Sequence, residues 1–241
     1  MMGRQRIWTV VPVKRFSAAK VRLAPILSAS ERADLARTMF EDVLDTLKQC
    51  KDLVSEMVVV TSDFDAAALA RCSGLAVVAD EPECVVNAAV ARAIAAIRPA
   101  ADSGLIIIPS DIPQLSRNAI AQATAAIEKS PSLALAEAAD DGGTNLFALR
   151  PIGAVPLLFG QHSFTLHRSA ALQAGIPVQV LRIPELFLDI DRPENLKAFV
   201  ALGSRTRTHE YLIRIGVHDR IAGYNDAVRR PLDQTVAGAQ E

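Results

Sequence analysis

Charged residues follow several of the apolar segments that we expect to be strands. They form a basic set and an acidic set, namely Lys14, Lys20 and Arg22 after the first segment, and Asp80, Asp111, Asp189 and Asp191 after later ones. In an open parallel sheet, ligands bind at the carboxyl ends of the strands, so these side chains are expected at one edge of the sheet. Lysine and arginine neutralise phosphate oxygens, while carboxylates hold the Mg²⁺ that bridges them. The pattern predicts a nucleoside triphosphate site, although a solvated basic turn would also explain the three cations.

Asp189 and Asp191 are candidate metal ligands. They stand two positions apart, so on an extended segment both project from one face and can grip a cation. A helix start is the competing interpretation, because Asp191-Arg192-Pro193-Glu194 has the spacing of a capping box. Capping would leave Asp189 unexplained between two apolar neighbours, where an unpaired carboxylate is costly. Asp111, directly after another strand, is a third candidate, with a turn or a helix cap as its alternative.

Other kinds of site are disfavoured by what the sequence lacks. Neither G-x-G-x-x-G nor G-x-x-x-x-G-K-[ST] occurs, which counts against a dinucleotide-dependent dehydrogenase and a P-loop NTPase. The histidines show no zinc spacing, so we expect surface or packing roles for His162, His167, His209 and His218. The cysteines are too scattered for a disulfide framework or a redox motif, which favours a reducing cytosol: Cys50, Cys72 and Cys84.

A second candidate site for an anion precedes the helix predicted over 163–174. Ser163 is a good helix cap, and the neighbouring backbone N–H groups would point outward toward a carboxylate or a phosphate. Simple capping is the alternative. It would need Ser163 but not Gly160 as a residue of close approach.

Alternating strands and helices must position these residues. We expect strands over 7–13, 57–61, 75–79 and 105–108, and helices within 28–53 and over 66–72, 87–97 and 118–129. Ser30 is the expected cap of the first helix. Later segments change the rhythm, with an antiparallel pair over 132–138 and 144–149, extended segments within 178–190 and a last helix over 193–202. The order predicts a three-layer α/β/α sandwich around a mixed, mainly parallel sheet.

Composition bounds the domain count and the partners. The chain has 241 residues, of which 50% are hydrophobic, enough for the core of one domain. A formal net charge of -1 offers no field for nucleic acid or an acidic membrane, and no apolar run reaches the roughly 20 residues of a membrane span. We therefore expect a cytoplasmic protein with one domain over 1–203, which carries the predicted nucleoside triphosphate site, and an extension over 204–241 that either docks as a partly ordered tail or joins a partner. Residues 212–217 in that extension would suit a homodimer contact.

Five sequence blocks occur in the order of one known family. They are Pro12-Val13-Lys14 with Ala19-Lys20-Val21-Arg22-Leu23, Ser110-Asp111-Ile112-Pro113, Asp141-Gly142-Gly143-Thr144-Asn145, Phe159-Gly160-Gln161-His162-Ser163-Phe164 with His167, and Asp189-Ile190-Asp191-Arg192-Pro193-Glu194. Together they resemble the guanylyltransferases of coenzyme F420 biosynthesis, within the nucleotidyltransferases of glycosyltransferase-A-like fold. The blocks D-G-G-T-N and F-G-x-x-S-F are the specific ones.

The resemblance implies a Mg²⁺-dependent reaction of GTP with a small phosphorylated acid, namely phosphoenolpyruvate, 2-phospho-L-lactate or 3-phospho-D-glycerate. Pyrophosphate would leave, and the product would pass to a downstream deazaflavin transferase. The family's contacts to the acid fall on Thr144, Gly160 and Ser163, and its metal ligands fall on Asp111, Asp189 and Asp191. The predicted nucleotide contacts are Lys14, Lys20, Arg22, Asp80 and Asn87.

The expected mechanism is positioning and charge neutralisation, because the acceptor phosphate is already ionised near neutral pH and needs no general base. Lys14, Lys20 and Arg22 would act as catalytic residues that stabilise the departing pyrophosphate. Two alternatives stay open. One is a cytidylyl- or molybdopterin-type nucleotidyltransferase on the same scaffold, and the other is a non-catalytic scaffold whose tail binds a partner.

Overall fold

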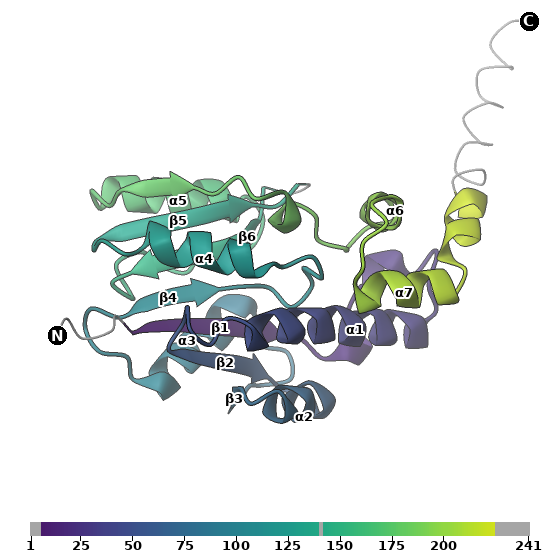
Figure 1. Cartoon of the computed structure of the whole chain (residues 1–241), viewed down its shortest axis with the longest axis horizontal. Coiled ribbons are helices and arrows are strands. Elements are labelled where there is room, and N and C mark those ends of the chain that lie inside the picture. The colour runs from purple at the N-terminus through teal and green to yellow at the C-terminus, as the bar shows by residue number, and fades with distance from the viewer. Residues whose placement is uncertain (1–5, 140–141, 225–241) are drawn as a thin grey trace, which may run out of the picture.

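Seven strands form one mixed sheet in the computed structural model, which describes residues 6–139 and 142–224 (Figure 1). The sheet order is β3-β2-β1-β4-β6-β5-β7. The strands are β1 (Ile7–Val13), β2 (Glu56–Thr61), β3 (Ala76–Ala79), β4 (Gly104–Ile107), β5 (Ser132–Glu137), β6 (Thr144–Arg150) and β7 (Val178–Val180). β6 alone runs antiparallel to its neighbours β4 and β5, which confirms the predicted antiparallel pair. β1 lies between β2 and β4, so the chain reverses its direction of travel across the sheet beside β1.

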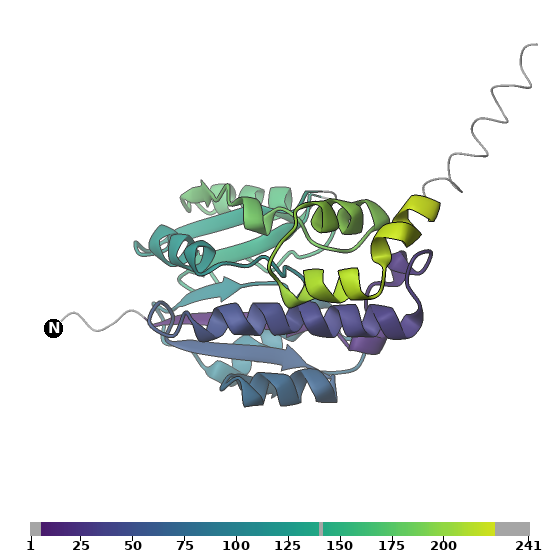
Figure 2. The same cartoon turned by 45° about the vertical axis from the view of Figure 1, so that its right-hand side comes forward.

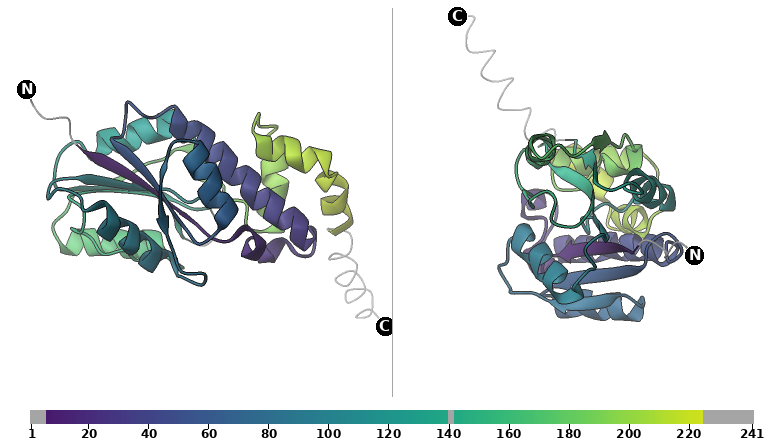
Figure 3. Two further views of the ribbon diagram at one scale, coloured as in Figure 1. Left: turned by 90° about the horizontal axis from the view of Figure 1, so that it is seen from below. Right: turned by 90° about the vertical axis from the view of Figure 1, so that its left-hand side faces the viewer.

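Helices cover both faces of the sheet, which confirms the three-layer sandwich (Figure 3). One face carries α1 (Ala29–Lys48), α2 (Phe64–Cys72) and α4 (Arg117–Ala126), and the other carries α3 (Val86–Ile97) and α5 (Ser163–Gln173). Successive strand residues alternate between the two cores, as Val10 and Val11 of β1 do. No helix in the described part of the chain is long and apolar enough to cross a bilayer.

The longest helix, α1, begins at a capping box. The Ser28 hydroxyl accepts a bond from the backbone N–H of Glu31, and the Glu31 carboxylate accepts one from the backbone N–H of Ser28. Two otherwise unpaired donors of the first turn are thereby satisfied. The expected cap at Ser30 was wrong by two residues, because Ser28 has the glutamate three positions later that completes the box. A stripe that includes Leu35, Met39 and Leu47 then faces the sheet.

The segment after β7 differs from the expectation. Regular strand pairing ends at Val180, and a short 3-10 helix, η3 (Pro184–Leu186), interrupts the predicted extended run. Residues 188–191 therefore reach the sheet edge as irregular chain. Asp191 is not the cap of α6 (Pro193–Ala201), because Arg192 takes that position and its backbone N–H donates to Oδ1 of Asn195 at 2.9 Å. The capping interpretation of Asp191 was wrong, and its carboxylate is free for another partner.

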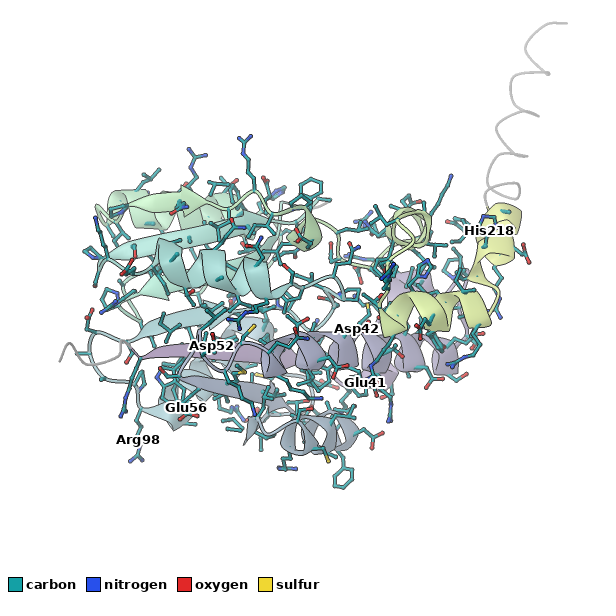
Figure 4. The ribbon with its side chains drawn as sticks, in the orientation of Figure 1. Glu41, Asp42, Asp52, Glu56, Arg98 and His218 are labelled. Carbon is teal, nitrogen blue, oxygen red and sulfur yellow. The ribbon has the colours of Figure 1, made fainter. Side chains whose placement is uncertain are left out.

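Helix α7 (Arg207–Arg214) lies along α1 (Figure 2). Asp42, labelled on α1 in Figure 4, accepts bonds from the backbone N–H groups of Arg207 and Thr208 at 2.9 Å each and from the Thr208 hydroxyl at 2.6 Å. Burial raises the pKa of this carboxyl, although these donors oppose the shift. Leu212 and Val217 are fully buried in the same core as α1. Residues 207–217 thus pack on the domain, which fits a partly ordered extension. The domain boundary at 203 and the homodimer contact over 212–217 stay predictions, and residues 225–241 of the expected extension lie outside the described residues.

Candidate active site

A cavity of about 500 Å³ opens at the carboxyl ends of β1, β2 and β4. This is the edge at which ligands bind in open α/β sheets. Its wall contains most of the charged residues singled out in the sequence, namely Lys14, Lys20, Arg22, Asp80, Asp111 and Asp191. Apolar side chains, including Phe16, Met39 and Val60, complete the lining. The structure thus brings residues as far apart in the sequence as Lys14 and Asp191 to one cavity.

Lys20 is the centre of the charged group. Its side chain is 6% exposed, and its Nζ lies 2.7 Å from Oδ2 of Asp111 and 3.8 Å from Oδ1 of Asp191. The residue precedes the 3-10 helix η2 (Val21–Leu23) and has a left-handed backbone with φ 56°. Few residues other than glycine adopt that conformation without cost, so the structure accepts local strain to aim this ammonium group inward.

An ion pair of Arg22 connects the loop after β1 to the irregular segment 188–191. Its Nη1 donates to Oδ2 of Asp191 at 2.7 Å, across 169 positions of sequence. Because the Arg22 side chain is 56% exposed, the pair adds little stability by itself. Its effect is to hold the Asp191 carboxylate at the cavity wall.

Asp189 does not line the cavity, but it lies close enough to Asp111 and Asp191 for their charges to affect its pKa. Burial is the largest cause that raises the pKa of Asp189 to about 6; the charges of Asp111 and Asp191 act in the same direction, and Lys20 opposes them. Burial acts in the same direction on Asp111, but the charge of Lys20 and its hydrogen bond outweigh burial and leave the Asp111 pKa below its ordinary value. Asp111 and Asp191 therefore contact Lys20, and Asp189 is close enough to interact with their charges. Asp189 and Asp191 lie on irregular chain rather than at a strand end.

The donor chemistry of this group fits a hard divalent cation. Carboxylate oxygens are the protein ligands that Mg²⁺ prefers. The pKa of Asp189 is raised first by burial and then by the charges of Asp111 and Asp191, and a bound cation would favour its ionised form. Within residues 6–139 and 142–224, no three acidic, histidine or cysteine side chains already stand in a coordination arrangement. Lys20 and Arg22 neutralise Asp111 and Asp191 instead.

A second cluster lies at the start of β6 and α5. The hydroxyl groups of Thr144 and Ser163 are 3.0 Å apart, and Oγ1 of Thr144 lies 3.2 Å from Nδ1 of His167. Ser163 is not the helix cap that we expected, because His162 holds the cap position with a left-handed φ of 56°. The Ser163 hydroxyl is therefore available to Thr144. Gly160 has φ 143°, a backbone conformation that side-chain-bearing residues rarely adopt, so glycine is required there for backbone geometry.

His167 is the residue that the sequence analysis undervalued. It is fully buried, and its ring lies 4.8 Å from the ring centre of Phe147 and 4.9 Å from that of Phe159. Burial lowers its pKa to about 4, so the imidazole is neutral near pH 7. The expected packing role is present, but both ring nitrogens also have polar partners. One signal could have found it, because His167 stands four positions after Ser163 and thus on the same helix face.

Two asparagines anchor the loops around these clusters. The Asn87 amide donates to the backbone carbonyl of Phe159 at 3.0 Å and accepts from the backbone N–H of Phe159 at 2.8 Å. Asn87 is outside the cavity wall, so its nucleotide contact stays a prediction. Asn145, to which the sequence analysis assigned no role, donates to the carbonyl of Leu186 at 2.9 Å. This bond connects β6 to the segment that precedes Asp189. Asp141 of the D-G-G-T-N block lies outside the described residues.

Replacing Asn87 with leucine is expected to destabilise the fold by about 1–3 kcal/mol. The substitution removes both partners of the Phe159 backbone groups, which are partly buried, and an unmade hydrogen bond of this kind costs that amount. Thermal unfolding by circular dichroism checks it. Asn87→Asp keeps the acceptor for the Phe159 N–H and serves as the matched variant, with a smaller expected loss. An unchanged melting temperature in Asn87→Leu would contradict the anchoring role.

Comparison with known proteins gives concordant matches. The profile of the family described as "Guanylyl transferase CofC like" matches residues 7–229. A phosphoenolpyruvate guanylyltransferase of Roseiflexus sp. (strain RS-1) is 38% identical over 190 residues, which are 79% of this chain and 83% of that protein. A 2-phospho-L-lactate guanylyltransferase of Methanothermobacter thermautotrophicus is 34% identical over 206 residues, 86% of this chain and 89% of that protein. In fold, a nucleotide-diphospho-sugar transferase from Desulfovibrio desulfuricans G20 aligns with a TM-score of 0.72 at 17% identity, covering 92% of this chain and 99% of that one.

Proposed function

The chain belongs to the CofC-like family of guanylyl transferases and is a nucleotidyltransferase, and from this premise we propose that it joins GTP to a small phosphorylated acid. The acceptors that we consider are phosphoenolpyruvate, 2-phospho-L-lactate and 3-phospho-D-glycerate. The observation that supports the proposal best is the buried Lys20 between Asp111 and Asp191 at the wall of a 500 Å³ cavity. Paired cations and carboxylates at this sheet edge are what a triphosphate and its metal require.

In the proposed reaction an oxygen of the acceptor phosphate attacks the α-phosphorus of GTP. The bond between the α-phosphorus and the bridging oxygen to the β-phosphate breaks, and pyrophosphate leaves with that electron pair. Because a phosphate monoester carries nearly two negative charges at pH 7, the nucleophile needs no base. Lys14, Lys20 and Arg22 would neutralise the triphosphate as charge moves to the leaving group.

Asp111, Asp189 and Asp191 would hold Mg²⁺ in this proposal. The ion would supply charge neutralisation between two anionic phosphates, whose repulsion in a closed cleft is large. Lys20 and Arg22 fix the positions of the Asp111 and Asp191 carboxylates through their ion pairs.

Thr144, Gly160 and Ser163 would bind the acid part of the acceptor. In this proposal the diphosphate-linked product is consumed by a downstream deazaflavin transferase in coenzyme F420 biosynthesis, in the cytoplasm. The names of the two relatives support phosphoenolpyruvate and 2-phospho-L-lactate as the first acceptors to assay.

A nucleotide and acceptor matrix tests the proposal. The purified protein is incubated with Mg²⁺, one of GTP, ATP, CTP or UTP, and each phosphoacid in turn, and pyrophosphate release is measured. We expect release only with GTP and at least one of the three acids, and none when Mg²⁺ is chelated. The downstream transferase is added in parallel to draw off an unstable product. Consumption of CTP would instead favour a cytidylyltransferase, and no release in any well would overturn the proposal.

A further inference from the structure

We propose that His167 is a positioning residue that sets the direction of the hydrogen bonds in the Thr144–Ser163 hydroxyl pair. In this direction the pair donates a hydrogen bond to an anionic oxygen of the acceptor. The identity of the ligand, a carboxylate of a small phosphorylated acid, rests on the proposed function. The direction of the hydrogen bonds does not, because it follows from the atoms of the chain alone.

The argument begins at Leu158. Its backbone N–H donates to Nε2 of His167 at 2.9 Å. A backbone N–H can only donate, so Nε2 must present its lone pair. The fully buried ring is neutral near pH 7, and a neutral imidazole carries one proton, which must then lie on Nδ1. Asn87 supports this arrangement, because it holds the adjacent backbone at Phe159 in place.

Nδ1–H of His167 faces the Thr144 hydroxyl at 3.2 Å and therefore donates to it. The Thr144 and Ser163 hydroxyls have two protons between them, and their mutual bond at 3.0 Å uses one. One O–H proton is left to donate outside the group. With the opposite tautomer, the Thr144 hydroxyl would donate to Nδ1 of His167 and the Ser163 hydroxyl would donate to Thr144. No O–H group would then be left to donate to a ligand. The tautomer of His167 therefore decides whether the pair offers a proton.

The pair lies at the same sheet edge as the charged cluster. β6 is antiparallel to β4, and Phe147 pairs with Ile107. Thr144, three residues earlier in β6, therefore stands beyond the carboxyl end of β4, where the chain continues to Asp111. Thr144 is 6% and Ser163 1% exposed, so an O–H donor left without an acceptor here would be unfavourable. A carboxylate oxygen, which only accepts hydrogen bonds, is the matching ligand.

Two isosteric substitutions separate positioning from packing. Asparagine at 167 can place its amide N–H near the position of Nδ1 and keep the bond to Thr144, whereas glutamine extends to the position of Nε2 and loses it. We expect His167→Gln to weaken phosphoenolpyruvate binding roughly 10- to 100-fold, the worth of a hydrogen bond to a charged group. His167→Asn should stay within a few-fold of the unsubstituted protein, and GTP binding should not change in either variant.

Calorimetry of phosphoenolpyruvate binding with Mg²⁺ and without GTP measures these affinities without turnover, and circular dichroism establishes that both variants fold. Equal losses in the two variants would overturn the inference in favour of a packing role, as would no phosphoenolpyruvate binding by the unsubstituted protein. Binding that follows the expected pattern, in a protein that does not turn over GTP, would refute the proposed function and leave this inference standing.

Nitrogen NMR of the ligand-free protein tests the tautomer directly. Protein labelled with ¹⁵N-histidine gives signals for four histidines, and the pair of signals that His167→Asn removes belongs to His167. We expect a protonated Nδ1 and a lone pair on Nε2 throughout pH 6–8, an interval about the ordinary histidine pKa of roughly 6.5. A proton on Nε2, or a ring that becomes charged in this interval, would contradict the proposal even in an active enzyme.

Discussion

Asp189→Asn is expected to abolish guanylyl transfer, with a loss of roughly 10³-fold or more, while the protein stays folded and becomes no less stable. Asparagine keeps the size of the side chain and removes the charge that the proposed Mg²⁺ site needs. Turnover is measured as pyrophosphate release at saturating GTP, phosphoacid and Mg²⁺. Glu194→Gln, an exposed carboxylate three positions after Asp191, is the matched control and should retain activity.

The same substitution is expected to raise the melting temperature in a chelating buffer. Burial and the charges of Asp111 and Asp191 raise the Asp189 pKa to about 6, so in the folded protein its ionised form is disfavoured. The penalty grows as pH rises through the interval from about 4, the ordinary aspartate pKa, to about 6, and persists above it. The stability gained by Asp189→Asn should therefore shrink as pH falls toward 4. Unchanged turnover at saturating Mg²⁺ would remove Asp189 from the metal site.

Lys20→Met should impair both activity and stability. Methionine keeps an apolar stem of similar length and carries the same left-handed backbone strain, so the variant isolates the ammonium group. Its loss leaves Asp111 and Asp191 without their shared cation. Breaking a buried ion pair typically costs about 3–5 kcal/mol, and we expect the lower end because the Asp111 side chain is 31% exposed. Turnover should fall roughly 10²- to 10³-fold.

The pH dependence identifies the cause. In the natural protein Lys20 overcomes the effect of burial and lowers the Asp111 pKa, so the ion pair contributes stability above the ordinary aspartate pKa and loses it as pH falls. Without Lys20, burial dominates, and stability should fall as pH rises instead. Chemical unfolding at several pH values measures this. Lys14→Met, at an exposed cation of the same cavity, should show little change in stability, and a pH profile of Lys20→Met parallel to the natural one would contradict the explanation.

The charged site was predictable because strand ends and residue types are local features of the sequence. β1 and β4 end where their apolar runs end, so Lys14 and Asp111 could be assigned to the same edge before the fold was known. Asp189 and Asp191 were also identified, although strand pairing ends at Val180 and the expected extended run does not continue to them. Their spacing and the cost of an apolar setting were enough to select them, but neither could show that Arg22 would be the partner of Asp191.

What local pattern could not predict depends on partners far away in the chain. His167 has the sequence environment of any packing histidine, and its role depends on Thr144 of another element and on the backbone of Leu158. Asp42 has the same difficulty, because on α1 alone it resembles a solvated acid, whereas its partners lie 165 and 166 residues away. Such contacts follow from tertiary packing, which overrides single-residue expectation.

The hydrogen bonds between α7 and Asp42 of α1 help to hold the C-terminal helices, next to the segment that carries two of the proposed Mg²⁺ ligands. The segment that carries Asp189 and Asp191 belongs to no strand, and α6 begins two residues after Asp191, so its position depends on the α6–α7 pair staying closed on α1. Fraying of that pair would release two of the three aspartates while the sheet stayed whole. Cleavage of the chain between α6 and α7 by a protease is accordingly expected to abolish activity under conditions in which the core stays folded.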